Sequence, residues 1–411
     1  MNIGRLVREF SFVKGNFLIL LVSWTLMSFA SSIPDTYYSL YVLALGGTEI
    51  NIGTIGFASF LILAFIQFPG GYFADKHGRR WLIVIMTFGV AVSYLGYAAA
   101  QSWHFILAAA ILQNLCLVYQ PALGAITADS IPPERRGVGF SMQTLLPNLA
   151  GLSGPMIAGV LYLSLGLIFA MRIGYSVSFI LFLIAAILRA RLHETLKDKA
   201  KRPGVLEALG SYPRAVKDSI EVWRYLPKAA FILFLVSVFV QFFALMCSPF
   251  LVVYATKVLA ITGFQWAMIL TIIVGTRMAV ALPSGKIIDR FGRRIPLALS
   301  LLLLCPSALL FVSGEYGMLL AFSLLFGVGN SMFGIAQQSL QADLIPREHR
   351  GKAIGCIQFA TYVLAGIGQL VGGILYRNVA PQIPFLLFAV SSLCLAVIAV
   401  VFIQEPSKRE V

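Results

Sequence analysis

The chain has 411 residues, of which 59% are hydrophobic and only 12% are charged. Soluble domains are about half apolar and about a quarter charged, so this composition excludes an ordinary soluble protein and indicates a polytopic membrane protein. The net charge of +14 does not predict a nucleic-acid partner, because the basic residues lie in short clusters between apolar runs of membrane-spanning length.

Twelve apolar runs are long enough to cross a lipid bilayer, which takes about 20 helical residues. In chain order the predicted spans are 17–45, 52–74, 81–100, 103–128, 138–163, 167–188, 229–259, 265–288, 295–313, 317–342, 353–376 and 383–403. The sequence therefore predicts an all-α membrane protein in which residues 1–188 and 229–411 each contribute six transmembrane helices. Residues 189–228 carry ten Lys or Arg and five acids, and we expect them to form a solvated linker.

A short motif of charge and glycine occurs twice in the chain. Its two copies read Gly71-Tyr-Phe-Ala-Asp75-Lys-His-Gly78-Arg79-Arg80 and Gly285-Lys-Ile-Ile-Asp289-Arg-Phe-Gly292-Arg293-Arg294, 214 positions apart. A second pair, around Asp129 and Asp343, keeps the same offset of 214. Two motif pairs in one register indicate an internal duplication, so we expect two pseudo-symmetric six-helix bundles.

The distribution of Lys and Arg predicts the orientation in the membrane. All but four of the 31 basic residues fall in the terminal segments, the linker or alternate loops; the four exceptions are Arg172, Lys257, Arg277 and Arg377. By the positive-inside rule, both termini and the linker are then cytoplasmic, and we expect a multi-pass protein of the plasma membrane.

The repeated motif resembles the loop signature of the major facilitator superfamily, which is called motif A. The resemblance covers essentially the whole chain and implies a transporter that alternates access to a midplane site between two parallel bundles. A carboxylate such as Asp75 would favour the positive end of a neighbouring helix, and Arg79 or Arg80 would pair with Asp129, holding one access state closed. The gating set that this predicts is Gly71, Asp75, Gly78, Arg79, Arg80, Asp129, Gly285, Asp289, Gly292, Arg293 and Asp343.

The fifth predicted span contains a glycine-proline segment with Gly154, Pro155 and Gly159. It resembles motif C of the superfamily's drug/proton antiporters, although Ala150 and Ala158 stand where that motif usually has glycine. Proline bends a helix and small residues allow close approach, so the segment is a candidate hinge; ordinary small-residue helix packing is the alternative. The fourth-span arginine of many proton-coupled members is replaced by Ala109, which weakens a scheme built on that arginine.

Charged residues at membrane depth are costly and need a partner, a wet cavity or a function. Asp35, which follows Pro34, is the candidate proton-coupling residue. An apolar layer disfavours the ionised form of a carboxylate and so favours its reversible protonation. The alternative is that Asp35 lies at the external mouth of the protein. Arg277 would bind an anionic substrate group or form a structural ion pair. Arg172 is expected to reach the outer headgroups.

Uncharged polar side chains lie in the spans that line the cavity in this superfamily. They are candidate substrate-binding residues together with Arg277, or else hydrogen-bonding contacts between helices: Gln113, Gln120, Asn148, Gln241, Asn330, Gln337, Gln358 and Tyr362.

The sequence gives no support to an enzyme, because it contains no HExxH, GxSxG or phosphate-loop motif, and its five cysteines form no CxxC pair. We therefore expect a monomeric transporter with no cofactor or metal, whose partners are a small-molecule substrate, protons and the lipid bilayer. Proton-coupled antiport of an amphipathic drug-like molecule is the first hypothesis. An organic anion, sugar or other metabolite is the alternative, and a receptor or lipid scramblase on the same fold is less favoured.

Overall fold

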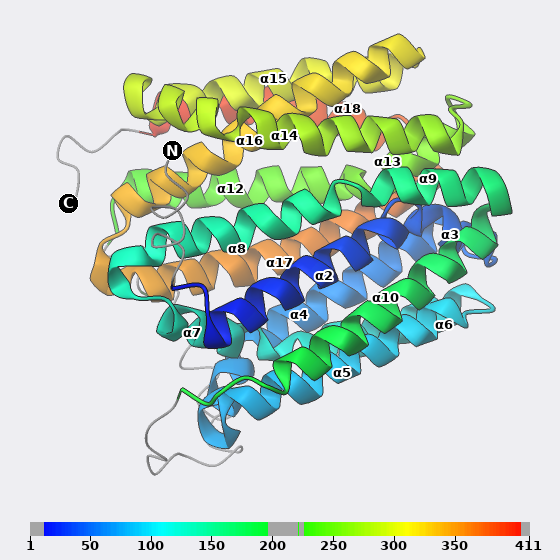
Figure 1. The fold of residues 1–411 in the computed structure, drawn as a ribbon. Coiled ribbons are helices and arrows are strands. Elements are labelled where there is room, and N and C mark those ends of the chain that lie inside the picture. The colour runs from blue at the N-terminus through cyan, green and yellow to red at the C-terminus, as the bar shows by residue number, and fades with distance from the viewer. Residues whose placement is uncertain (1–11, 196–220, 222–225, 404–411) are drawn as a thin grey trace, which may run out of the picture. The chain divides into compact units, whose positions relative to one another are not determined.

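The computed structural model describes residues 12–195, 221 and 226–403 (Figure 1). For residues 67–77 and 347–352 it describes the helical backbone and not the side chains. Within the described residues the chain is helical and has no strand. The helices in chain order are α2 (Gly15–Asp35), α3 (Tyr38–Ala44), α4 (Glu49–His77), α5 (Arg79–Ala98), α6 (Trp103–Cys116), α7 (Gln120–Ser130), α8 (Arg136–Gly151), α9 (Gly154–Leu165), α10 (Leu167–Arg189), α12 (Lys228–Cys247), α13 (Leu251–Lys257), α14 (Gly263–Phe291), α15 (Arg294–Ser313), α16 (Tyr316–Leu344), α17 (Arg347–Asn378) and α18 (Ile383–Phe402).

Twelve segments of the described chain are long and apolar enough to cross a membrane, which confirms the prediction of an all-α protein with twelve spans. Three of these segments are each broken into shorter helices. In each one a proline stands at the start of the helical segment after the break: Pro121 in α7, Pro155 in α9 and Pro249 in the 3₁₀ turn before α13. Proline lacks a backbone donor and is tolerated in the first turn of a helix, where these three stand. Proline alone does not divide a span, since Pro283 and Pro306 lie inside unbroken helices.

The contacts divide the chain into two compact units. Unit 1 comprises 1–41 and 65–212, and unit 2 comprises 42–64 and 213–411. The first part of α4 thus belongs to unit 2, where Glu49 Oε2 lies 3.6 Å from Arg377 Nη1 of α17. Most of the expected linker lies outside the described residues, so its boundaries at 189 and 228 stay a prediction.

Each unit has an aromatic core. In unit 1, α10 lies between α2 and α5, and Tyr97 stacks on Tyr175 with ring centroids 4.9 Å apart. In unit 2, α15 packs on α16 and α18, and Phe311 contacts Phe322 at 4.9 Å and Phe385 at 5.0 Å. Large apolar side chains also remain on the outside of both units, as a lipid-facing surface requires.

One basic residue of the expected linker belongs to the core of unit 1. Arg189 ends α10 and is fully buried, so the expectation of a solvated linker is wrong at this position. Its guanidinium reaches hydroxyl groups of α2, α5 and the short 3₁₀ turn Leu117–Tyr119. These contacts replace the water that a linker arginine would have.

Candidate functional site

The first charged motif forms a local network around the start of α5. Arg79 Nη1 lies 2.7 Å from Asp129 Oδ2, near the end of α7, and 3.3 Å from Thr195 Oγ1. Gly78 precedes the helix with a φ of 92°, a region that favours glycine. The structure thus brings Arg79 and Asp129 together inside unit 1, and their gating role remains a prediction.

Arg80 makes different contacts from Arg79. Its backbone N donates to Glu194 Oε2 at 3.0 Å and its Nη2 donates to the Ala190 carbonyl at 2.6 Å. Glu194 follows α10 and was not a predicted site residue. Only the tertiary structure brings this carboxylate to the motif, since more than a hundred residues separate it from Arg80 in the sequence.

The second copy of the motif repeats the ion pair within unit 2. Arg293 Nε lies 3.0 Å from Asp343 Oδ2, and Gly292 has a φ of 82°. Asp289 is exposed on α14, which also carries Gly285. In the first copy, the side chain of Asp75 and the surroundings of Gly71 lie outside the described residues.

The glycine-proline segment lies where the fifth span breaks between α8 and α9. A Cβ added at Gly154 would overlap with Ser32 Oγ of α2, and one at Gly151 would lie 3.1 Å from Ser28 Oγ. Pro155 is in the first turn of α9, and Gly154, Pro155 and Gly159 are buried. The small residues therefore allow a close contact with α2, while the hinge role is a prediction.

The carboxylate proposed for proton coupling ends the first helix. Asp35 is the last residue of α2, and its side chain is exposed. The nearby Tyr38 is half-buried and meets Tyr97 edge-on, with ring centroids 6.4 Å apart. Asp35 therefore lies beside the tyrosine-rich core of unit 1 and is itself accessible.

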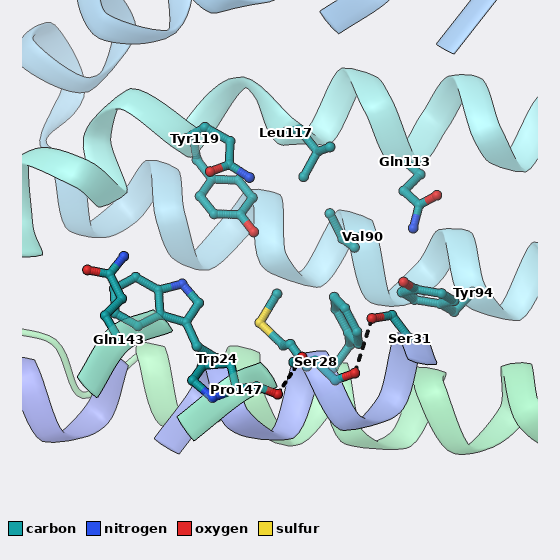
Figure 2. Close-up of a pocket in the computed structure, with 13 residues that line it drawn as sticks. Trp24, Ser28, Ser31, Val90, Tyr94, Gln113, Leu117, Tyr119, Gln143 and Pro147 are labelled. Atoms are coloured by element: carbon teal, nitrogen blue, oxygen red, sulfur yellow. Dashed lines mark hydrogen bonds between the residues drawn. The ribbon is translucent and has the colours of Figure 1, made fainter. Parts of the chain in front are cut away.

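Unit 1 contains a cavity of about 370 Å³ (Figure 2). Its lining residues come from six helices and the 3₁₀ turn: Trp24, Met27, Ser28, Ser31, Val90, Tyr94, Gln113, Leu117, Tyr119, Gln120, Gln143, Pro147 and Phe182. None of these described lining residues carries a charge. The cavity thus offers aromatic and apolar walls with a few hydroxyl and amide groups, the mixture that suits a small organic ligand.

Several polar groups of the cavity already have protein partners. Ser28 Oγ donates to the Pro147 carbonyl at 2.8 Å, and Ser31 Oγ donates to the Ser28 carbonyl at 3.4 Å (Figure 2). Gln113 Oε1 accepts a hydrogen bond from Tyr97 Oη at 3.0 Å, which leaves the amide nitrogen as the group that can donate to a ligand.

Of the predicted substrate-binding residues, the cavity contains Gln113 and Gln120 only. Asn148 is exposed and its Nδ2 donates to the Thr144 carbonyl of its own helix. The remaining predicted residues lie in unit 2, where Gln241, Asn330, Gln337 and Tyr362 are half-buried and Arg277 and Gln358 are exposed. Arg172 of unit 1 donates to the Ala100 carbonyl at 3.3 Å.

Sequence reasoning missed most of the cavity wall. Trp24, Ser28 and Ser31 recur at the three- and four-residue spacing of one helix face, a signal that was present in the sequence. Tyr119 and Gln143 were also missed, although Tyr119 precedes the predicted Gln120 and Gln143 lies between Ser141 and Thr144. Among the described residues, no cluster of His, Cys, Asp and Glu is arranged to hold a metal ion.

Comparisons with known proteins agree with this fold. The model of the Major Facilitator Superfamily matches residues 15–280 and 233–411. Multidrug resistance protein MdtG of Enterobacter lignolyticus (strain SCF1) is 26% identical over 390 residues, which is 92% of this chain and 89% of that protein. The Na(+), Li(+), K(+)/H(+) antiporter of Planococcus maritimus is 30% identical over 159 residues, 36% of this chain and 37% of that protein.

The crystal structure of a mutant of the nucleoside transporter NupG shares the fold. Its TM-score is 0.74 at 16% sequence identity, and the alignment covers 94% of this chain and 100% of that chain. Because the family model matches both halves of the chain and the helices form the twelve-span fold, this protein belongs to the Major Facilitator Superfamily and is a membrane transporter, not an enzyme.

Proposed function

We propose that this protein is a secondary active transporter that works by alternating access and couples efflux of an amphipathic small molecule to proton entry. The observation that carries the proposal is the cavity of unit 1, about 370 Å³ in volume, with uncharged aromatic, apolar and amide walls. Such walls suit a substrate with a large apolar part and few polar groups. The similarity to the multidrug resistance protein MdtG along 92% of the chain supports the same substrate class.

Proton coupling is assigned to Asp35. A proton carrier must exchange protons with water during the cycle, and the exposed carboxylate at the end of α2 meets that requirement. In the proposed cycle, protonation and substrate binding favour different access states, so that proton entry drives substrate exit. The motif residues around Arg79 and Arg293 then stabilise one of these states, and the segment at Gly154 and Pro155 bends between them.

The experiment is transport in sealed liposomes that contain the purified protein. Ethidium is a suitable probe because it is permanently charged, so a pH gradient alone does not trap it. With an acidic interior, wild-type protein is expected to accumulate ethidium in exchange for protons. Asp35→Asn should lower this accumulation to the level of protein-free liposomes while ethidium exchange without a pH gradient persists.

The matched control is Glu315→Gln, which neutralises an exposed carboxylate at the start of α16, in unit 2. This variant should accumulate ethidium like the wild type. Normal pH-driven accumulation in Asp35→Asn would exclude Asp35 as the proton site. Absence of any pH-dependent ethidium flux in the wild type would contradict antiport of this substrate class.

A second candidate function is transport of an organic anion or another metabolite, which one observation favours. Arg277 is exposed on α14, and its carbonyl accepts a hydrogen bond from Ser331 Oγ at 3.1 Å, while its guanidinium is accessible to an anionic group. If this function holds, p-aminohippurate should be transported, and Arg277→Ala should reduce its flux far more than that of ethidium. We also propose a plasma-membrane monomer with cytoplasmic termini, as the basic clusters predict.

A further inference from the structure

A fully buried arginine stands directly behind one wall of the unit 1 cavity. Arg189 Nε donates to Ser23 Oγ at 3.0 Å, and Nη1 donates to Thr87 Oγ1 at 2.9 Å and to Tyr119 Oη at 3.3 Å. The guanidinium carbon also lies 5.6 Å from the centre of the Tyr119 ring. Tyr119 lines the cavity, so of these hydrogen bonds of Arg189 the one to Tyr119 leads to the cavity wall.

The surroundings of Arg189 are unusual for a buried cation. All three partners are neutral hydroxyl groups, no carboxylate of the described residues forms an ion pair with it, and Nη2 is buried without a hydrogen-bond partner. Burying a charge without a counter-ion destabilises a protein unless the environment compensates for lost water. A role in the function of the cavity would explain why the arginine is there.

The hydroxyl protons around Arg189 can be assigned one by one. Ser23 Oγ donates to the Leu20 carbonyl at 2.9 Å and Thr87 Oγ1 donates to the Ile83 carbonyl at 2.6 Å, so both protons are used within their own helices. Tyr119 Oη accepts from Arg189, and no acceptor for its own proton is found among the described residues. Tyr119 therefore has a free donor.

Tyr119 is only 1% exposed, so this donor lies in the wall of the cavity and does not project into it. In Figure 2 the hydroxyl end of its ring points toward the interior of the group of lining residues, on the side of Val90. Because a guanidinium donates to the phenol oxygen, it polarises the O–H bond and strengthens it as a donor in a low-dielectric site. The amide nitrogen of Gln113 adds a second donor to the same cavity.

We propose that Arg189 is a positioning residue that holds the Tyr119 hydroxyl as a hydrogen-bond donor to the substrate, so that the cavity selects molecules bearing an acceptor oxygen such as a carbonyl. The inference rests on the proposed function, since it takes the cavity as a substrate site. It narrows the substrate class to amphipathic molecules that place a carbonyl-type oxygen against Tyr119. Hydrocarbon-like molecules of the same shape bind less tightly.

The test compares benzophenone with diphenylmethane, which have the same two rings and differ by a carbonyl in place of a methylene group. Binding of each radiolabelled probe to detergent-purified protein is measured at equilibrium. Wild-type protein should prefer the ketone, and Tyr119→Phe should weaken ketone binding about fivefold while leaving the hydrocarbon unchanged. Partition into micelles cancels because each probe is compared between proteins in the same detergent.

The positioning role of Arg189 is tested by the same ratio of ketone to hydrocarbon affinity. Arg189→Met should lower the ratio toward that of Tyr119→Phe, and Arg189→Lys, which keeps the charge, serves if the methionine variant does not fold. The control is Tyr162→Phe, which removes a tyrosine hydroxyl from unit 1 outside the cavity and should leave the ratio unchanged. A general loss of packing would weaken both probes equally and would not move the ratio.

An unchanged ratio in Tyr119→Phe, equal wild-type affinity for the two probes, or no binding of either would overturn the inference, whatever the transport assay shows. A ratio that falls as expected in a protein without pH-driven ethidium flux would support the acceptor site and contradict proton-coupled transport. The two failures are therefore distinguishable.

Discussion

The two ion pairs of the repeated motif allow a test of how exposure sets the strength of a salt bridge. Arg79 and Asp129 are closer, at 2.7 Å, but their side chains are 17% and 47% exposed. Arg293 and Asp343 are 3.0 Å apart and only 13% and 16% exposed. If water screening decides, the second pair is the stronger one despite its longer distance.

The magnitudes follow from the exposure. An ion pair with a half-exposed carboxylate is worth about 0.5 kcal/mol, because water screens it and competes for both groups. Less water reaches the second pair, so its Coulomb attraction is screened less; its Nε–Oδ2 contact does not have the geometry of a hydrogen bond, and we expect a coupling of about 1.5 kcal/mol. We therefore expect the Arg293–Asp343 coupling to be about threefold larger than the Arg79–Asp129 coupling.

The assay is a double-mutant cycle on the free energy of unfolding in mixed micelles. The first cycle uses Arg79→Gln with Asp129→Asn, and the second uses Arg293→Gln with Asp343→Asn, so that each acts as the matched control of the other. Independent sites add to within about 0.5 kcal/mol, which sets the resolution of the comparison. A larger coupling for the exposed pair, or additive effects at the shielded pair, would refute the reasoning.

Two further predictions concern the backbone and the topology. Gly78→Ala and Gly292→Ala should each destabilise the protein by about 1–2 kcal/mol in thermal unfolding, because the φ values of these glycines are 92° and 82°. The control is Gly124→Ala on helix α7, where an added Cβ would have no neighbour within 4 Å; this variant should be neutral or stabilising. In intact cells, a membrane-impermeant maleimide should label the Gln101→Cys variant, and it should label the Glu134→Cys variant only after the cells are permeabilised. Labelling of the wild-type chain gives the background. The reverse pattern would contradict cytoplasmic termini.

The sequence by itself determined the number and the approximate positions of the spans, but not their limits: the first was expected at 17–45 and its helix ends at Asp35. Within a bilayer each backbone group must find its hydrogen-bond partner inside the segment, so a long apolar run has little choice but to become a helix. The resemblance to motif A offered Arg79 and Asp129 as a pair, and the duplication extended it to Arg293 and Asp343 because the two copies share one register. These are local or repeated signals, and they do not depend on how the helices pack.

Only the tertiary structure decided the environment of single polar side chains. In the sequence, Arg189 follows an apolar run and precedes a highly charged stretch, where a buried arginine and a solvated one look the same. Its burial depends on Ser23, Thr87 and Tyr119, which come from distant segments and meet only when α2, α5 and α10 pack together. The cost of burying a charge is set by its neighbours in space, which is why the sequence could supply the arginine but not its place beside the cavity.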